Sequence, residues 1–268
     1  MENGESECLI NLISHFAILI SAVSGHSKWS TIKRQKGAND AKRGVAFTKL
    51  GNAITIAVRE GGGGDPDSNF KLRLAMDKAR EANMPKENIS RAIDRGLGKG
   101  GEVALENVLY EGFAPHGVAV LIESVTDNKN RTNGEVKNIL SKGGGALGSS
   151  GSVGYLFKKQ GEIVISKSSN SNKASNPNEI LEIMLNSGAE DMTEDEEAFI
   201  VYTRIDNLHQ VKTKLEEQGL KVDAAELVYT PNKETMIALS DEEGKSVINL
   251  LSELEDLDDV QNVYSNLA

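Results

Sequence analysis

Residues 107–125 read NVLYEGFAPHGVAVLIESV, and this stretch decides the fold class. Two runs rich in β-branched and other apolar residues, 107–113 and 117–125, flank the turn sequence Ala114-Pro115-His116-Gly117. Runs of this kind on either side of a short Pro/Gly turn predict a pair of strands. We therefore expect a sheet that begins at residue 107.

Downstream of these strands, helix and strand patterns follow one another without a regular β-α-β series. The predicted helices span 132–142, 179–186, 207–218 and 241–255, and the predicted strands span 155–157, 162–165, 198–203, 221–229, 235–239 and 260–264. This grouping favours an α+β fold over a doubly wound parallel sheet. The terminal strand–helix–strand segment can complete the sheet begun at residue 107, with the preceding segment inserted as a subdomain.

Upstream of the strands, the sequence predicts three short helices with glycine-rich connections. Apolar residues recur every three or four positions in 40–60, the run Gly61–Gly64 ends that helix, and a second helix follows. Pro85 suits the first turn of a third helix that directs Ile89, Ile93 and Leu97 inward. We expect a basic helical domain over 25–98, an α+β domain over 99–159 plus 231–268, and an inserted α+β domain over 160–230.

Residues 1–24 are expected to be a leader outside these domains. Their apolar run, 9–23, is shorter than the about 20 residues of a transmembrane helix. It lacks the basic start of a secretory signal and the arginines of a transit peptide. One interpretation is a single-span anchor; the other is a misplaced gene start, with Val23 as the translated initiator.

The charge of the chain is unevenly distributed. The formal net charge is −10, but residues 25–100 carry +8 and residues 101–268 carry −15. Within 25–59, eight Lys and Arg residues face only one acidic residue, Asp40. The single cysteine, Cys8, excludes an intrachain disulfide framework and indicates a reduced, cytoplasmic protein. The basic end of the chain, not its acidic body, is therefore the part expected to meet an anionic partner.

Motifs for catalysis and cofactor binding are missing from the sequence. No P-loop motif occurs, and the glycine-rich stretch 145–154 precedes a strand, so it predicts a loop and not a dinucleotide site. The four histidines have no metal-ligand spacing. The acidic clusters 194–197 and 253–259 are expected to be solvated faces. We expect no enzyme activity, no cofactor, no metal and no small-molecule substrate.

The basic segment, residues 26–49, predicts contact with nucleic acid, since clustered Lys and Arg neutralise phosphates largely independently of the nucleotide sequence. The candidate contacts are His26, Lys28, Trp29, Lys33, Arg34, Lys36, Lys42, Arg43 and Lys49. Trp29 either stacks on a base or pins this segment to the helical bundle. In the later helices, basic and acidic residues alternate, so nucleic-acid contact and a solvated charged face both remain open.

A second candidate contact lies in residues 126–132, where Lys129 and Arg131 flank an expected helix start. The alternative is that this Asp/Asn-rich loop only caps its own helix.

Many motifs, in order over residues 24–268, resemble the YebC/PmpR family, which includes the mitochondrial translational activator of cytochrome c oxidase. They are Gly25-His26-Ser27-Lys28-Trp29, Lys33, Lys36, Asp40, Lys42-Arg43-Gly44, Phe47-x-Lys49, Gly63-Gly64-Asp65-Pro66, Asn83-Met84-Pro85, Arg91-Ala92-Ile93-x-Arg95-Gly96, Tyr110-Glu111-Gly112, Thr126-Asp127-Asn128-x-Asn130-Arg131-Thr132, Leu147-Gly148-x-x-Gly151-Ser152-Val153 and Asp259-Val260-Gln261-x-Val263-Tyr264. The leader 1–23 and the polar stretch 168–178 depart from the family pattern.

The resemblance implies three domains, the third inserted in the second, and no enzymatic chemistry. It implies a DNA-binding transcriptional regulator acting on promoter DNA. The alternative that it leaves open is a ribosome-associated, RNA-binding translation factor that relieves stalling at proline-rich stretches. We find no clear helix-turn-helix signature. A membrane partner is not expected.

Overall fold

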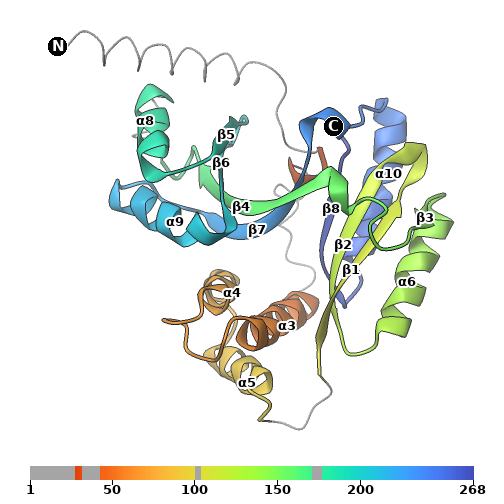
Figure 1. Cartoon of the computed structure of the whole chain (residues 1–268), viewed down its shortest axis with the longest axis horizontal. Coiled ribbons are helices and arrows are strands. Elements are labelled where there is room, and N and C mark those ends of the chain that lie inside the picture. The colour runs from red at the N-terminus through yellow and green to blue at the C-terminus, as the bar shows by residue number, and fades with distance from the viewer. Residues whose placement is uncertain (1–27, 32–42, 100–103, 171–176) are drawn as a thin grey trace. The chain divides into compact units, whose positions relative to one another are not determined.

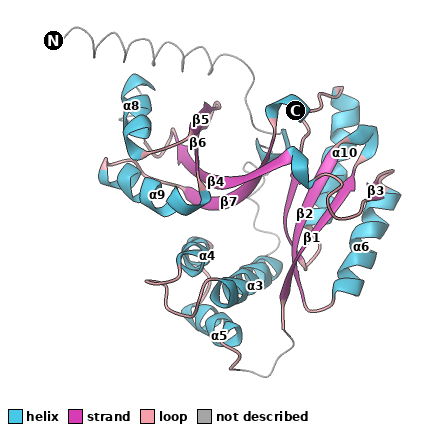
Figure 2. Ribbon diagram, viewed as in Figure 1, coloured by secondary structure: helices cyan, strands magenta, loops and turns pink. Residues whose placement is uncertain are grey.

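The computed structural model describes residues 28–31, 43–99, 104–170 and 177–268, so the leader 1–24 lies outside the described residues. The chain is mixed helix and sheet with an N-terminal helical region, which confirms the predicted α+β class (Figure 1, Figure 2). Its described residues form two compact units, one of Gln160–Val228 and one of Ser27–Lys159 with Tyr229–Ala268. No described helix is both long enough and apolar enough to cross a bilayer.

The helical region contains α3 (Arg43–Glu60), α4 (Phe70–Glu81) and α5 (Lys86–Gly96). Their apolar stripes meet in one buried cluster that includes Ile54, Leu72 and Ile89. The prediction that Leu97 points inward is wrong. This residue follows the end of α5 at Gly96, so its side chain leaves the helical stripe and is 44% exposed.

The connection from α3 to α4 depends on Asn69, which is 1% exposed. Its side-chain amide donates to the carbonyl oxygens of Ala57 and Gly63, both at 2.8 Å. Its oxygen caps α4 by accepting from the amide of Leu72. Gly63 has a φ of 133°, which residues with a side chain rarely adopt. The turn therefore needs both the glycine and the buried asparagine.

The first sheet is formed by β1 (Glu106–Phe113), β2 (Ala119–Thr126), β3 (Ala146–Leu147) and β8 (Val260–Ser265), in the order β3-β1-β2-β8. Strands β1 and β2 are antiparallel, with Glu106 opposite Thr126 and Phe113 opposite Ala119. Strand β8 pairs with β2, which confirms that the end of the chain completes the sheet.

Two helices pack against one face of this sheet: α6 (Lys129–Lys142) and α10 (Asp241–Glu255) (Figure 1). Ile122 of β2, Leu140 of α6 and Leu251 of α10 are fully buried in the shared core. Helix α10 begins at a capping box in which Ser240 and Glu243 bind each other's backbone amides.

Two predicted strands are shortened beside 3-10 turns. Residues 235–239 contribute only a bridge between Ile237 and Leu267, because the turn Lys233–Thr235 precedes them and the N-cap of α10, Ser240, follows. The segment predicted as a strand over 155–157 begins instead with the turn Gly154–Leu156.

Apart from the two-residue strand β3, the glycine-rich stretch 145–154 forms loop and turn structure, as predicted, and it encloses a protein carboxylate. Glu111, which is 6% exposed, accepts hydrogen bonds at 2.7 Å from the amides of Gly151, Val153 and Gly154. Burial opposes ionisation, but these amides still lower the pKa of Glu111. The amides that a phosphate would need are therefore occupied by Glu111.

The second sheet has the order β5-β6-β4-β7, formed by β4 (Phe157–Ser166), β5 (Asp191–Glu194), β6 (Ala198–Thr203) and β7 (Ala224–Pro231). Its helices are α8 (Pro177–Ser187) and α9 (Leu208–Glu217), with a 3-10 turn at Ile205–Asn207. Strand β5 was not expected from the sequence, since its four residues, DMTE, lack an apolar alternation.

Candidate nucleic-acid interface

The described start of the basic segment is a helical piece over residues 28–31, fixed to the first sheet. The indole Nε1 of Trp29 donates to the carbonyl oxygen of Val263 at 3.0 Å, and the ring is 1% exposed. The amide of Lys28 donates to the carbonyl oxygen of Leu267 at 2.9 Å. Trp29 therefore anchors the segment and cannot stack on a base. Its partner is the core around β8 and α10, and not the helical bundle expected from the sequence.

Two predicted contact lysines have protein partners. Lys28 Nζ lies 3.6 Å from an oxygen of the exposed Asp241. Lys49 Nζ donates to the backbone carbonyl oxygen of Glu255, at the C-terminal end of α10, where a helix attracts cations. Lys49 thereby joins α3 to α10. Arg43 is the first residue of α3, and the remaining predicted contacts, His26, Lys33, Arg34, Lys36 and Lys42, lie outside the described residues.

The loop between β2 and α6 caps its own helix, as the alternative interpretation predicted. The side-chain oxygen of Asn128 accepts from the amide of Arg131 at 3.1 Å. The helix starts at Lys129, three residues earlier than predicted, and Lys129 Nζ forms an ion pair with Glu106 at 2.5 Å.

Asp259 is the centre of a hydrogen-bond network beside this loop. Its Oδ2 accepts from Thr132 Oγ1 at 2.7 Å, Arg131 Nη2 at 2.7 Å and Thr126 Oγ1 at 3.0 Å. Burial opposes its ionisation, but the donors from Thr132, Arg131 and Thr126 lower the pKa of Asp259. The expectation that all of 253–259 is a solvated face is wrong at Asp259, whose side chain is 13% exposed.

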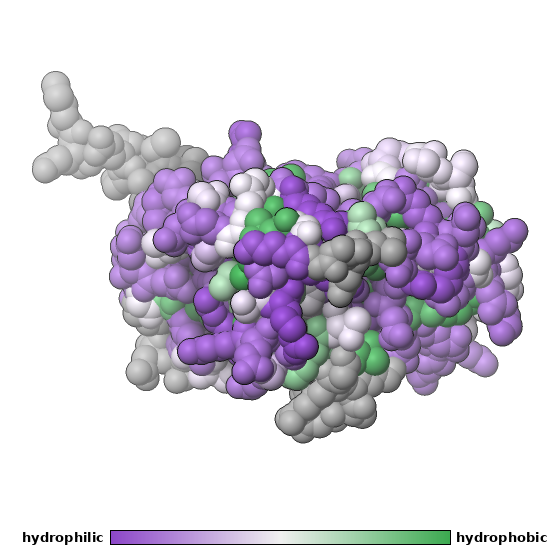
Figure 3. Space-filling model, turned by 90° about the horizontal axis from the view of Figure 1, so that it is seen from below, coloured by the Kyte–Doolittle hydropathy of each residue, from purple (hydrophilic) through white to green (hydrophobic). Residues whose placement is uncertain are grey.

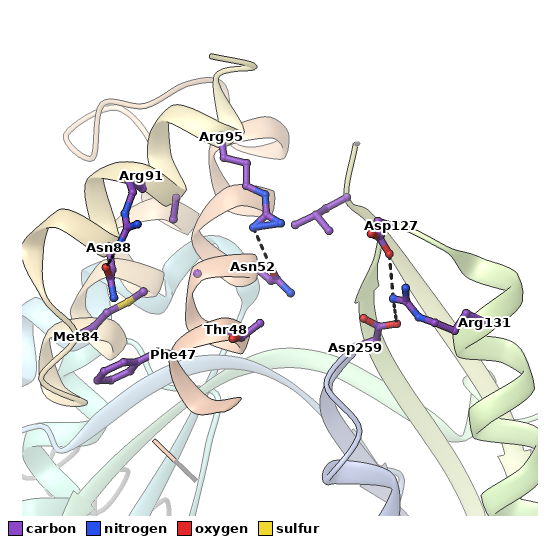
Figure 4. A pocket seen from close by; sticks show the side chains of 13 residues that line it. Phe47, Thr48, Asn52, Met84, Asn88, Arg91, Arg95, Asp127, Arg131 and Asp259 are labelled. Carbon is purple, nitrogen blue, oxygen red and sulfur yellow. Dashed lines mark hydrogen bonds and ion pairs between the residues drawn. The ribbon is translucent and has the colours of Figure 1, made fainter. Parts of the chain in front are cut away.

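A pocket of about 500 Å³ lies between α3, α5 and this network (Figure 4). Three arginines line it: Arg91 and Arg95 on α5, and Arg131 from the opposite wall. Its other lining residues are Phe47, Thr48, Gly51, Asn52, Met84, Asn88, Ala92, Leu105, Asp127 and Asp259. The arginines of α5 are held by asparagines: Arg95 Nη1 donates to Asn52 Oδ1 at 3.3 Å, and Arg91 donates to Asn88 Oδ1.

The two walls of the pocket differ in charge. The α5 wall carries two guanidinium groups. On the facing wall, Arg131 is paired with both Asp127, at 2.9 Å, and Asp259, so this wall carries a net charge of −1. The pocket can therefore hold an anionic group against α5 and hydrogen-bond donors against the carboxylates.

The sequence does not distinguish the α5 arginines from the other basic residues of the later helices. For all of these residues, nucleic-acid contact and a solvated face are both open. The structure separates them: Arg80 pairs with Asp77 and Lys71 with Glu60, whereas Arg91 and Arg95 enter the pocket. The signal in the sequence was their spacing of four, which places like charges on one helix face at a cost in stability.

No His, Cys, Asp and Glu side chains within the described ranges cluster in threes to hold a metal ion. The face of the molecule in Figure 3 is mostly hydrophilic, with hydrophobic residues in small separate patches.

Comparison with known proteins matches two family descriptions to the chain. Residues 27–99 match "TACO1/YebC protein N-terminal domain", and residues 105–267 match "TACO1/YebC second and third domain". A relative from Chloroflexus aurantiacus, named "Probable transcriptional regulatory protein", is 49% identical over 245 residues, which are 91% of this chain and 95% of that protein. A relative of the same name from Acidithiobacillus ferrooxidans is 50% identical, over 91% of this chain and 94% of its own.

A solved structure is also similar. It is the crystal structure of a conserved hypothetical protein from Aquifex aeolicus, which is 42% identical with a TM-score of 0.77. The match covers 85% of this chain and 91% of that one.

Proposed function

Because the chain belongs to the TACO1/YebC family, we propose that it is a nucleic-acid-binding regulator of gene expression, and specifically a DNA-binding transcriptional regulator. The names of its relatives, probable transcriptional regulatory proteins, support a regulatory role. In this proposal the protein acts in the cytoplasm and catalyses no reaction.

The observation that carries the proposal is the uneven charge of the unit that contains α3–α5. Residues 25–59 contain eight basic residues against Asp40, and two further arginines, Arg91 and Arg95, line the pocket on α5. Cations on one part of an otherwise acidic protein attract phosphates and orient the molecule. The anchoring of Trp29 supports this interpretation, because it ties the start of the basic segment to a rigid core.

The direct test reverses two charges of the basic segment. We expect the double variant Lys33→Glu with Lys36→Glu to weaken binding to many DNA sequences alike. We also expect it to lower the slope of log Kd against log salt concentration by about 2, since each phosphate contact contributes about 0.9. The charge-matched control is Lys137→Glu with Lys142→Glu, on the exposed face of α6. Unchanged affinity in the first variant would contradict the role of the segment.

A second experiment identifies the nucleic acid. The native protein is crosslinked in cells, and the bound nucleic acid is sequenced. Discrete promoter DNA supports the transcriptional regulator. Recovery of ribosomal RNA instead would replace it with a ribosome-associated translation factor, and recovery of no nucleic acid would overturn both.

A further inference from the structure

We infer that the pocket between α3, α5 and the Asp259 network receives a single unpaired nucleotide, with its phosphate on Arg91 and Arg95 and its base over Phe47. This inference rests on the proposed function, because it specifies which part of a nucleic acid the pocket takes. Four features of the pocket suit a nucleotide: the cationic wall, the facing carboxylates, the apolar floor and the size of the space.

The cationic wall has a geometry suited to phosphate. Arg91 and Arg95 are four residues apart, so both side chains lie on the same face of α5. Each is held by an asparagine, Asn88 or Asn52, which limits the rotamers that must be ordered on binding. Two guanidinium groups one turn apart on a helix create a positive potential that favours a bound anion. A planar guanidinium donates two parallel hydrogen bonds to phosphate oxygens.

The facing wall accepts hydrogen bonds. Arg131 is paired with two carboxylates, so it adds little positive potential, and a phosphate is drawn to α5 instead. Asp127 is exposed, and Figure 4 shows it across the pocket from Arg95. Its carboxylate can accept from the exocyclic amino group of a base.

The floor of the pocket is apolar and partly open. Phe47 and Met84 both line the pocket, where Phe47 packs against the buried cluster that includes Met84 (Figure 4). The ring of Phe47 supplies a face on which a base can stack. Gly51, in the middle of α3, also lines the pocket. A Cβ added there would meet Met84 Cε at 3.7 Å, an ordinary contact, so helix packing does not require the glycine. Its missing side chain leaves space in the pocket wall.

The volume sets the size of the ligand. A space of about 500 Å³ falls in the range of small-molecule pockets and can hold one nucleotide. A base that enters it has to leave its stack, so the nucleotide is unpaired, either at a strand end or displaced from a duplex.

The test uses adenosine 5′-monophosphate, adenosine and inorganic phosphate as probes, each titrated into the full-length protein by calorimetry. We expect the monophosphate to bind at least about tenfold more tightly than either fragment, since each fragment lacks one half of the contacts. Arg91→Met and Arg95→Met are expected to weaken monophosphate binding at least about tenfold. The matched control is Arg80→Met, which removes an exposed arginine of α4 outside the pocket and should leave the affinity unchanged.

One further variant separates loss of the pocket from loosened helix packing, which the Arg95 variant could cause between α5 and α3. Gly51→Leu fills the pocket without changing its charge and should abolish monophosphate binding. The inference is overturned if the monophosphate does not bind at millimolar concentration, if inorganic phosphate binds equally well, or if the pocket variants bind like the wild type. Failure of the proposed function has a different signature, which is loss of oligonucleotide binding while the monophosphate still binds.

Discussion

Arg131 Nη2 donates a 2.7 Å hydrogen bond to Asp259 Oδ2, and the two residues lie 128 positions apart in the sequence. Asp259 immediately precedes β8, the strand that completes the first sheet, and Arg131 lies in the first turn of α6. The bond therefore joins the end of the chain to the helix that follows β2. It also fixes the wall of the pocket that faces α5.

Replacing Asp259 by Asn is expected to destabilise the protein by about 1–3 kcal/mol at pH 7, because a carboxylate that accepts from three donors loses its charge. The measurement is urea unfolding. The neighbouring Asp258→Asn is the control and should change the stability by less than about 0.5 kcal/mol, since Asp258 is exposed. Equal effects of the two substitutions would contradict the structural role of Asp259.

The wild-type protein and the Asp259→Asn variant should differ in how their stability responds to acid. The pKa of Asp259 in the folded protein lies below its ordinary value of 3.8, because the donors outweigh burial. Its stabilisation is therefore complete above that value and is lost as pH falls through the lower folded pKa. We expect the stability gap between wild type and Asp259→Asn to narrow below about pH 4. A gap that stays constant to pH 2 would contradict this assignment.

Glu111→Gln is expected to cost about 1.5–3 kcal/mol, since three amides lose a charged acceptor and one of them would face the new side-chain NH₂ group. Hydrogen exchange at Gly151, Val153 and Gly154 should become faster than in the wild type. The comparison is Glu106→Gln, which breaks an exposed pair with Lys129 and should cost at most about 1 kcal/mol.

Two glycine-to-alanine substitutions in the helical region should have opposite effects. A Cβ at Gly96 would lie 2.6 Å from Val58 Cβ and 2.8 Å from the carbonyl oxygen of Thr55, so Gly96→Ala forces α5 away from α3. We expect a loss of about 1–3 kcal/mol. At Gly51 the added methyl group fits, and Gly51→Ala should gain about 0.5–1 kcal/mol from helix propensity. Thermal unfolding measures both, and a stabilising Gly96→Ala would refute the close approach.

The fluorescence of Trp29, the only tryptophan, should report a buried anchor. We expect blue-shifted emission, weak quenching by acrylamide, and no direct quenching when nucleic acid binds. As a reference, Tyr155→Trp in a Trp29→Phe background places the indole at a site that is 73% exposed, where acrylamide should quench strongly. Strong quenching of Trp29 by DNA would restore the stacking role.

Local patterns predicted most of the secondary structure. The strand 198–203 and the helix 241–255 have the predicted bounds, because a continuous apolar run in the strand and helical periodicity in the helix agree with burial. The predictions failed where an element has no periodic signal of its own. Strand β5 exists because β6 supplies its hydrogen-bond partners, and 235–239 is shortened because a helix cap follows directly.

The α+β class, the family and the concentration of positive charge near the start of the chain all follow from residue types in order, so the sequence was sufficient to predict them. The role of individual side chains became clear only in the folded protein. Trp29 is buried against β8, and Lys49 donates to the carbonyl oxygen of Glu255 at the end of α10. Asp259 binds Arg131 instead of facing solvent with its acidic neighbours. Partners that lie 128 to 234 residues apart have no local signature. Whether a charge meets solvent, a carbonyl or a carboxylate depends on which segments the fold brings together.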